Sequence, residues 1–289
     1  MIANRPVSSE LVSSGPMVAI GGAEDRTSEL VILKQVFALS PAHSNEVTVI
    51  AAASSIPDQI LPVYKAAFER LGASRVNVLA MQDRQQAFDP EAMRLIERSG
   101  IIFFTGGDQL RLTSAIGGSP VLRAIRERSR AGAVVAGTSA GAAALPDTMI
   151  SSGAAGDALR KDAVNMASGL GLVRGLMIDS HFLARGRFSR LMEVGATNPE
   201  YLGVGLGEDA AVIIHSNRIL EAIGPGHVII IDSRKLARSN IAALSMGEPV
   251  FIENMIVHSL ISGHGFDIEA RRYLVADELS AALERENGL

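Results

Sequence analysis

Short apolar runs and helical stretches alternate along the first half of this sequence. The apolar runs predict buried strands at residues 17–20, 47–53, 76–79, 101–104 and 133–136. Apolar residues at helical spacing predict helices at residues 28–39, 61–71, 90–98 and 121–131. Strands that are apolar on both faces and separated by helices are typical of parallel sheets. We therefore predict an α/β fold with a mainly parallel sheet sandwiched by helices.

The second half of the sequence is richer in predicted strands. Its apolar runs lie at residues 177–178, 212–214, 218–222 and 228–232. We expect several of them to be antiparallel additions to the same sheet. No internal repeat or linker divides residues 17–289, so we predict a single catalytic domain. Residues 1–16 are polar and rich in Ser, which predicts a flexible leader rather than a secretory signal.

Composition narrows the classes of function. A formal net charge of −4 argues against nucleic-acid binding, which usually needs a basic excess. The absence of cysteine excludes disulfides, thiolate zinc sites and a cysteine nucleophile, and it fits a reducing compartment. No apolar stretch reaches the ~18 residues that a membrane span needs. We therefore expect a cytoplasmic protein. Because the histidines are scattered and no His-Glu-x-x-His motif occurs, we expect no metal, and we predict no cofactor.

One short motif carries chemistry. The sequence Gly-Thr-Ser-Ala-Gly at residues 137–141 matches the Gly-x-Ser-x-Gly nucleophile elbow of hydrolases. A serine on a sharp strand-to-helix turn needs small neighbours, and residues 140–144 are all Ala or Gly. Free N–H groups at the start of the following helix, beginning at Ala140, suit a developing oxyanion. We therefore predict Ser139 as the nucleophile; the alternative is a glycine-rich turn with a capping serine.

A second glycine turn, Thr-Gly-Gly-Asp-Gln at residues 105–109, follows the predicted strand at residues 101–104. Parallel sheets gather their sites at the carboxyl ends of strands, so we expect this turn near Ser139. The backbone N–H of Gly107 or Asp108 is then a candidate for the second oxyanion donor. The alternative is an ordinary loop in which Asp108 caps a helix.

A general base and its acid are expected at other strand ends. His181 differs from the other histidines because it follows a predicted strand. The acid is expected in the glycine-rich segment 203–211, where Glu208 and Asp209 are adjacent and the pattern does not choose between them. A conventional α/β-hydrolase would instead place its histidine after the acid, at His227 or His258.

Five different short motifs follow one another along the chain, at residues 21–25, 104–109, 137–142, 179–190 and 207–208. Together they resemble the cyanophycinase family of serine peptidases, which also contains aspartyl dipeptidase. The resemblance implies a glutamine-amidotransferase-like fold, a homodimer, and a triad of Ser139, His181 and Glu208. It also implies hydrolysis of cyanophycin, a polymer of aspartate with arginine joined to each side chain, to β-aspartyl-arginine dipeptides. The chain departs from the family at Ser180 and Gly207, where Gln and an acid are common.

A cluster of arginines follows the predicted base, at Arg185, Arg187 and Arg190. Guanidinium groups bind carboxylates in bidentate fashion, so we predict that the cluster anchors a substrate carboxylate, with Arg187 as the first choice. The alternative is a solvated basic face paired with Glu193.

The arginine half of this substrate needs acids, and Asp108 and Asp179 are the candidates. Gln109 and Ser180, from the same motifs, complete the predicted substrate-binding residues. The predicted function is therefore cyanophycin hydrolysis, and the main alternative is an α-aspartyl dipeptidase or another short-peptide serine hydrolase. An ester hydrolase and a ligand-binding module are further alternatives. A nucleotide-binding oxidoreductase is disfavoured because the Gly-x-Gly-x-x-Gly spacing is missing.

Overall fold

The computed structural model describes residues 15–41, 44–153 and 159–286 of the chain. Residues 1–14 of the predicted leader lie outside the described residues. Gly15, at the end of that predicted leader, is buried and donates its N–H to the carbonyl of Ser129. The described packing therefore includes Gly15, which the sequence pattern assigns to the leader.

A nine-stranded sheet forms the centre of the described structure. Its parallel part consists of β3 (Arg75–Leu79), β2 (Glu46–Ile50), β4 (Ile101–Phe104), β5 (Val134–Thr138) and β1 (Met17–Ile20), in that order. Four antiparallel strands extend it from β1: β10 (Ala211–Ile214), β11 (Ile219–Ile223), β16 (Gly265–Asp267) and β17 (Arg272–Leu274). The predicted α/β architecture with extra antiparallel strands is confirmed.

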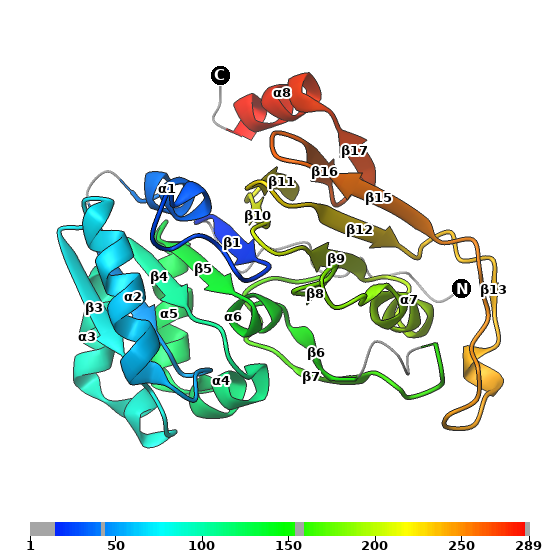
Figure 1. The fold of residues 1–289 in the computed structure, drawn as a ribbon, viewed down its shortest axis with the longest axis horizontal. Coiled ribbons are helices and arrows are strands. Elements are labelled where there is room, and N and C mark those ends of the chain that lie inside the picture. The colour runs from blue at the N-terminus through cyan, green and yellow to red at the C-terminus, as the bar shows by residue number, and fades with distance from the viewer. Residues whose placement is uncertain (1–14, 42–43, 154–158, 287–289) are drawn as a thin grey trace, which may run out of the picture.

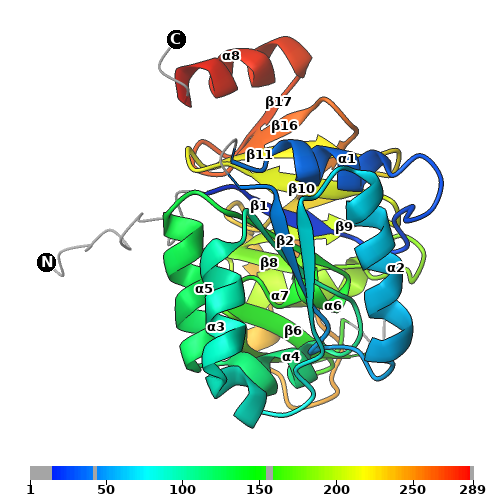
Figure 2. The same cartoon turned by 90° about the vertical axis from the view of Figure 1, so that its left-hand side faces the viewer.

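Helices cover both faces of the parallel part (Figure 2). One face carries α1 (Val31–Ala38) and α2 (Pro57–Arg70), and the other carries α3 (Pro90–Arg98) and α5 (Pro120–Arg130). Side chains alternate between the two faces of a strand, so Val18 of β1 packs with α1 and α2, whereas Met17 packs into the opposite core. This double burial explains why the strands are continuous apolar runs in the sequence.

A second sheet of four strands was not predicted as a separate sheet. It contains β8 (Leu176–Asp179), β9 (Leu202–Leu206), β12 (Val228–Asp232) and β15 (Ile256–Leu260), in the order β15-β12-β9-β8. The predicted strands at residues 177–178 and 228–232 belong to it, and not to the large sheet as we expected. Figure 1 shows these strands to the right of β1.

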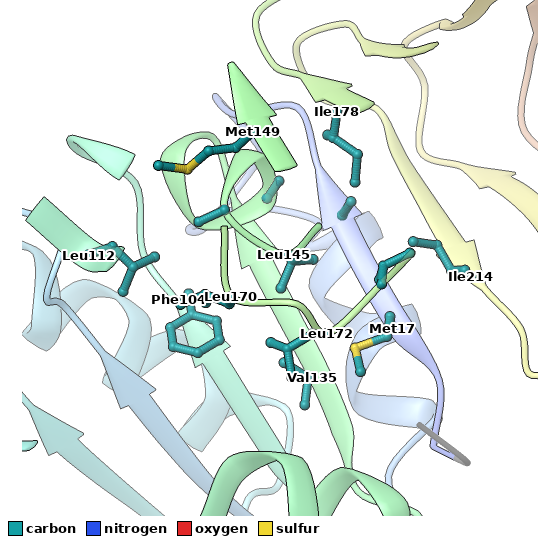
Figure 3. Close-up of a cluster of buried hydrophobic side chains, with 14 of the residues drawn as sticks. Met17, Phe104, Leu112, Val135, Leu145, Met149, Leu170, Leu172, Ile178 and Ile214 are labelled. Carbon is teal, nitrogen blue, oxygen red and sulfur yellow. The ribbon is translucent and has the colours of Figure 1, made fainter. Parts of the chain in front are cut away.

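The second sheet was not predicted because β9 lacks a typical strand pattern. Its sequence is Leu-Gly-Val-Gly-Leu. Glycine is disfavoured in strands, so the segment resembles a loop. Packing explains the glycine at position 205, because a Cβ there would lie 2.5 Å from the ring of Phe182. A shared core joins the two sheets: in Figure 3, Ile178 of β8 lies in the same buried cluster as Phe104 and Val135.

Several short elements complete the described fold. The helices are α4 (Gln109–Ile116), α6 (Ala140–Ala143), α7 (Phe188–Thr197) and α8 (Ala276–Glu286), with 3-10 turns η1 (Gln85–Phe88) and η3 (Ile241–Ala243). Two hairpins pair β6 (Thr148–Ser152) with β7 (Asn165–Ser168) and β13 (Arg238–Ser239) with β14 (Ile252–Glu253). Among the described residues, no helix is both long enough and apolar enough to cross a membrane.

Candidate active site

The carboxyl ends of strands from both sheets meet at one place. In the large sheet, β1 leads to Gly21 and β5 leads to Ser139; in the small sheet, β8 and β9 lead to His181 and Glu208. Backbone hydrogen bonds join the two sheets around the end of β1. The N–H of His181 donates to the carbonyl of Gly21 at 2.8 Å, and that of Ser139 donates to Ile20 at 2.9 Å. The end of β1 therefore fixes the nucleophile candidate and the base candidate relative to one another.

Ser139 has the strained backbone expected of a nucleophile elbow. Its φ of 53° and ψ of −112° fall outside the regions that residues other than glycine normally adopt. Glycines make the tight turn possible: a Cβ on Gly137 would lie 2.5 Å from the carbonyl carbon of Gly141, and one on Gly141 would lie 2.6 Å from the carbonyl oxygen of Phe104. The Gly-x-Ser-x-Gly spacing is thus required by backbone packing against β4.

Three side chains form a continuous hydrogen-bonded chain at this point. Ser139 Oγ lies 3.0 Å from Nε2 of His181, and Nδ1 of the same ring lies 2.8 Å from Oε1 of Glu208. The side chain of His181 is 15% exposed, so the ring is reachable but largely shielded from water. Gly22 lies against this ring, because a Cβ there would be 2.4 Å from Nε2. The distances fit a nucleophile, a base and an orienting acid.

The two adjacent acids left open by the sequence point in different directions. Glu208 contacts His181, whereas the Asp209 carboxylate accepts the N–H of Asp25 at 3.4 Å. The backbone of Asp209, with φ of 49°, donates to the carbonyl of Gly22 at 3.0 Å. Of the alternative bases, His258 packs its ring 5.3 Å from that of Phe266. The structure therefore brings Glu208 and His181 to the serine, in the order that the resemblance implies.

A cavity of about 330 Å³ opens beside Ser139 and His181, and we call it the Ser139 cavity. It is lined by Gly22, Ala23, Glu24, Arg26, Ser54, Ser55, Ile56, Ile60, Tyr64, Gly106, Gly107, Thr138, Ser139 and His181. Glu24, Arg26 and Tyr64 were not among the predicted site residues. The signal for Glu24, and for Arg26 next to it, was the Gly-Gly-Ala-Glu-Asp segment at residues 21–25, which follows β1 at the same edge of the sheet.

Glu24 supplies a buried carboxylate to the wall of the cavity. It is 3% exposed and accepts hydrogen bonds from the Tyr64 hydroxyl and, at 2.7 Å, from Thr138 Oγ1. Burial, together with the neighbouring carboxylate of Glu24, raises the pKa of Tyr64 well above its ordinary value. Tyr64 therefore stays protonated and holds Glu24 in place at physiological pH.

The segment after Glu24 is fixed by Asp25. Its carboxylate accepts the backbone N–H groups of Thr27 at 2.9 Å and Ser28 at 2.8 Å, together with those of residues 29 and 30. These hydrogen bonds hold the pKa of Asp25 well below its ordinary value. The spacing predicts that the helix begins at residue 28, but Leu30 has φ of 55°, outside the right-handed helical region, and α1 therefore begins at Val31.

The predicted oxyanion donors have different surroundings. Asp108 differs from the prediction, because its N–H donates to the carbonyl of Ala53 at 2.9 Å and its carboxylate caps α4 through the N–H groups of Leu110 and Arg111. The helix-cap alternative describes Asp108 correctly. Among the described residues, the N–H of Gly107 has no such acceptor, and Gly107 lines the cavity. Ala140 opens α6, where N–H groups of the first turn lack intrahelical acceptors.

The arginine cluster after His181 is mostly bound to a buried acid. Asp179 is 2% exposed; its Oδ1 lies 3.0 Å from Nη1 of Arg187 and its Oδ2 lies 3.1 Å from Nε of Arg190. Arg190 is also buried and donates to the carbonyl of Gly153 at 2.8 Å. Burial raises the pKa of Asp179, although both guanidiniums oppose this shift. We call Asp179, Arg187 and Arg190 the Asp179 cluster. This internal pairing contrasts with the substrate-binding role predicted for Asp179 and Arg190.

The remaining predicted substrate residues lie outside both the Asp179 cluster and the lining of the Ser139 cavity. Gln109 donates from Nε2 to the carbonyl of Ile150 at 2.8 Å, Ser180 is buried with its carbonyl bound to Arg187, and Arg185 is exposed. None of the three lines the Ser139 cavity. The alternative pairing with Glu193 is also absent from the described contacts, since that carboxylate accepts the N–H groups of residues 163 and 164.

A strained serine that is hydrogen-bonded to a His–Glu pair, at the edge of an open α/β sheet, is typical of the class of serine hydrolases. Among the described residues, no group of three His, Cys, Asp or Glu side chains is arranged to hold a metal ion. Residues 17–222 match peptidase family S51, and the chain belongs to that family. It is therefore a serine-type peptidase.

Individual relatives agree with this assignment, and one solved structure shares the fold. The chain is 36% identical to a cyanophycinase from Trichormus variabilis over 90% of this chain and 88% of the relative. It is 34% identical to a cyanophycinase from Geminocystis herdmanii over 86% of this chain and 91% of the relative. A peptidase structure from an acI-B1 actinobacterium matches with a TM-score of 0.66 at 18% identity, covering 89% of this chain and 98% of that one, which shows a shared fold.

Proposed function

We propose that this protein is a cyanophycinase, a serine-type exopeptidase that hydrolyses cyanophycin to β-aspartyl-arginine dipeptides. The observation that carries the proposal is the hydrogen-bonded chain of Ser139, His181 and Glu208 at the edge of the Ser139 cavity. Membership in peptidase family S51 and relatives named cyanophycinase along about nine-tenths of the chain support the substrate.

The geometry supports an acyl-enzyme mechanism. Ser139 Oγ attacks the scissile carbonyl while Nε2 of His181 accepts its proton, and the Glu208 carboxylate stabilises the imidazolium. The N–H groups of Gly107 and Ala140 bind the oxyanion of the tetrahedral intermediate. His181 then donates the proton to the leaving amine. Water hydrolyses the acyl-enzyme by the same route, with His181 as base, and restores Ser139.

We further propose that residues 17–289 act as one catalytic domain, in the cytoplasm and as a homodimer. The absence of cysteine supports a reducing compartment, and the resemblance of the five motifs to the cyanophycinase family supports the dimer.

Incubation of the purified protein with cyanophycin, followed by mass spectrometry of the soluble products, tests the proposed function. We expect β-aspartyl-arginine as the main product, and no product from the Ser139→Ala protein under the same conditions. α-Aspartyl dipeptides are assayed in parallel. Cleavage of these dipeptides without attack on cyanophycin would refute the proposed substrate and favour an aspartyl dipeptidase.

A further inference from the structure

Arg26 is a cation in the Ser139 cavity that has no carboxylate partner among the residues that the structure describes. It is partly buried and lines the cavity together with Ser139 and His181. In the ranges that the structure describes, it forms no ion pair with any carboxylate. Its guanidinium instead lies over the ring of Tyr64, 5.7 Å from the centroid. A guanidinium placed in a cavity and left unpaired is available to an anion from outside the protein.

The backbone that carries Arg26 is held from two sides. Asp25 binds the N–H groups of residues 27–30 from within the loop, and Arg70 of α2 donates to the carbonyls of Thr27 and Ser28 from outside. Stacking on Tyr64 restricts the side chain as well. Because the loop and the side chain are ordered in advance, little conformational entropy is lost when an anion binds.

The opposite charge lies in the same cavity. The Glu24 carboxylate already accepts two hydrogen bonds, yet a carboxylate has about four acceptor positions, so it has capacity for a further donor. One cavity therefore presents a fixed acid and an unpaired guanidinium beside the nucleophile. Each repeat of the proposed substrate is itself zwitterionic, because arginine joined through its α-amino group keeps a free carboxylate and a free guanidinium.

We propose that Arg26, and not Arg187, is the residue that binds a carboxylate of the substrate beside Ser139. The inference rests on the proposed function and specifies how the same site selects its substrate. Arg187 already donates from Nη1 to Asp179 and to the carbonyl of Ser180. Arg26 interacts with the hydroxyl and the ring of Tyr64, and no carboxylate or carbonyl of the described residues accepts a hydrogen bond from it. The carboxylate has two possible sources in cyanophycin: the arginine of each repeat, or the aspartate at the carboxyl end of the backbone.

Three synthetic oligomers of three repeats separate these sources. The first is the natural structure, the second carries argininamide in place of arginine, and the third has an amide at the carboxyl end of its backbone. Wild type, Arg26→Ala, Arg26→Lys and Arg187→Ala are assayed on each for kcat/KM. Arg75→Ala is the matched control, since Arg75 is an exposed arginine of β3 that does not line the cavity.

We expect Arg26→Ala to lower kcat/KM for the natural oligomer at least about tenfold, and Arg26→Lys to lower it less. On the oligomer that lacks the bound carboxylate, wild type should already be slow and Arg26→Ala should cause no further loss. That oligomer identifies the source of the carboxylate. Arg75→Ala should match wild type throughout.

Equal losses on all three oligomers, or a selective loss in Arg187→Ala but not in Arg26→Ala, would overturn the assignment of Arg26. Failure of the wild type to cleave the natural oligomer would instead refute the proposed function. In that event the same comparison is made with an α-aspartyl dipeptide and its carboxamide, and a loss in Arg26→Ala that is confined to the free acid still supports the inference.

Discussion

The Ser139 cavity and the Asp179 cluster contain the same chemical groups in opposite arrangements. In the cluster, one carboxylate is shared by two guanidiniums and all three side chains are largely shielded from water. In the cavity, Glu24 is held by hydroxyl groups and Arg26 has no carboxylate partner among the described residues. Charges that are paired and buried hold two segments of the chain together, while charges that face a cavity are available to a ligand.

The comparison teaches that an arginine-rich segment beside a catalytic base is not by itself a binding site. The sequence shows which charges lie near one another along the chain, but the partners of each charge come from distant segments. Arg190 binds the carbonyl of Gly153, and Tyr64 binds Glu24 across 40 positions. Variants in the two regions should therefore fail in different ways, by loss of turnover in the cavity and by loss of stability in the cluster.

Removal of the nucleophile should have the largest effect on the cavity side of this comparison. Ser139→Ala should lower turnover by about 10⁴-fold or more, because no other group in the described cavity is positioned to form the acyl-enzyme. The measurement is kcat on cyanophycin, with folding checked by circular dichroism. Near-normal turnover in a folded variant would show that the reaction takes place elsewhere.

The acid pair provides the next test. Glu208→Gln keeps the shape of the side chain but removes the charge that stabilises the imidazolium of His181, so kcat should fall by about 10³- to 10⁴-fold. Asp209→Asn, next to it in sequence, is the matched control and should retain most activity because its carboxylate contacts Asp25. The opposite ranking would assign the acid to Asp209.

The cluster side is tested by stability. Asp179→Asn leaves two guanidiniums without their anion in a buried position, which should lower the free energy of unfolding by about 3–5 kcal/mol. The midpoint of urea unfolding measures the change. Asp108→Asn, at an exposed helix cap where Asn serves about as well as Asp, should change the free energy of unfolding by less than about 0.5 kcal/mol. An unchanged midpoint in Asp179→Asn would contradict the structural role of the Asp179 cluster. It would instead favour the predicted role of these residues in substrate binding.

The smallest of these expected effects comes from adding one methyl group at Gly22, beside the ring of His181. Gly22→Ala would place a Cβ 2.4 Å from Nε2 of His181, so the ring must move and kcat should fall by about 10²-fold. Gly72→Ala is a close control, because Gly72 has φ of 96° against 98° for Gly22 but no atom within 4 Å of the added methyl group. Both variants place a side chain at nearly the same positive φ. Equal kcat values in the two would show that Gly22 does not position the ring.

Local patterns predicted much of the fold and the elbow. Continuous apolar strands and helical spacing gave the parallel sheet, and α3 begins and ends where the spacing predicts. The elbow is predictable because its glycines are imposed by contacts within a few residues and with the neighbouring strand. The helix α4 was missed because its capping residue, Asp108, was assigned to the site.

What the sequence could not supply were contacts between distant segments. The second sheet depends on β9, where Gly205 makes room for Phe182 and the two glycines weaken the usual strand signal. The side-chain partners of Asp179, and the position of Arg26 over Tyr64, follow from how separate elements pack. Burial and pairing decide the role of each of these charged side chains, and the residue type alone does not show either of them.

The position of the triad candidates across two sheets has a mechanical consequence. Ser139 belongs to the end of the large sheet, while His181 and Glu208 belong to the ends of strands in the small sheet, and the backbone of Gly21 bridges them. A slip of one ångström along this junction would open the contact between Oγ and Nε2 while both sheets kept every strand paired. The rate of catalysis therefore reports how well the two sheets are aligned. A measurement of helix and strand content does not detect this alignment.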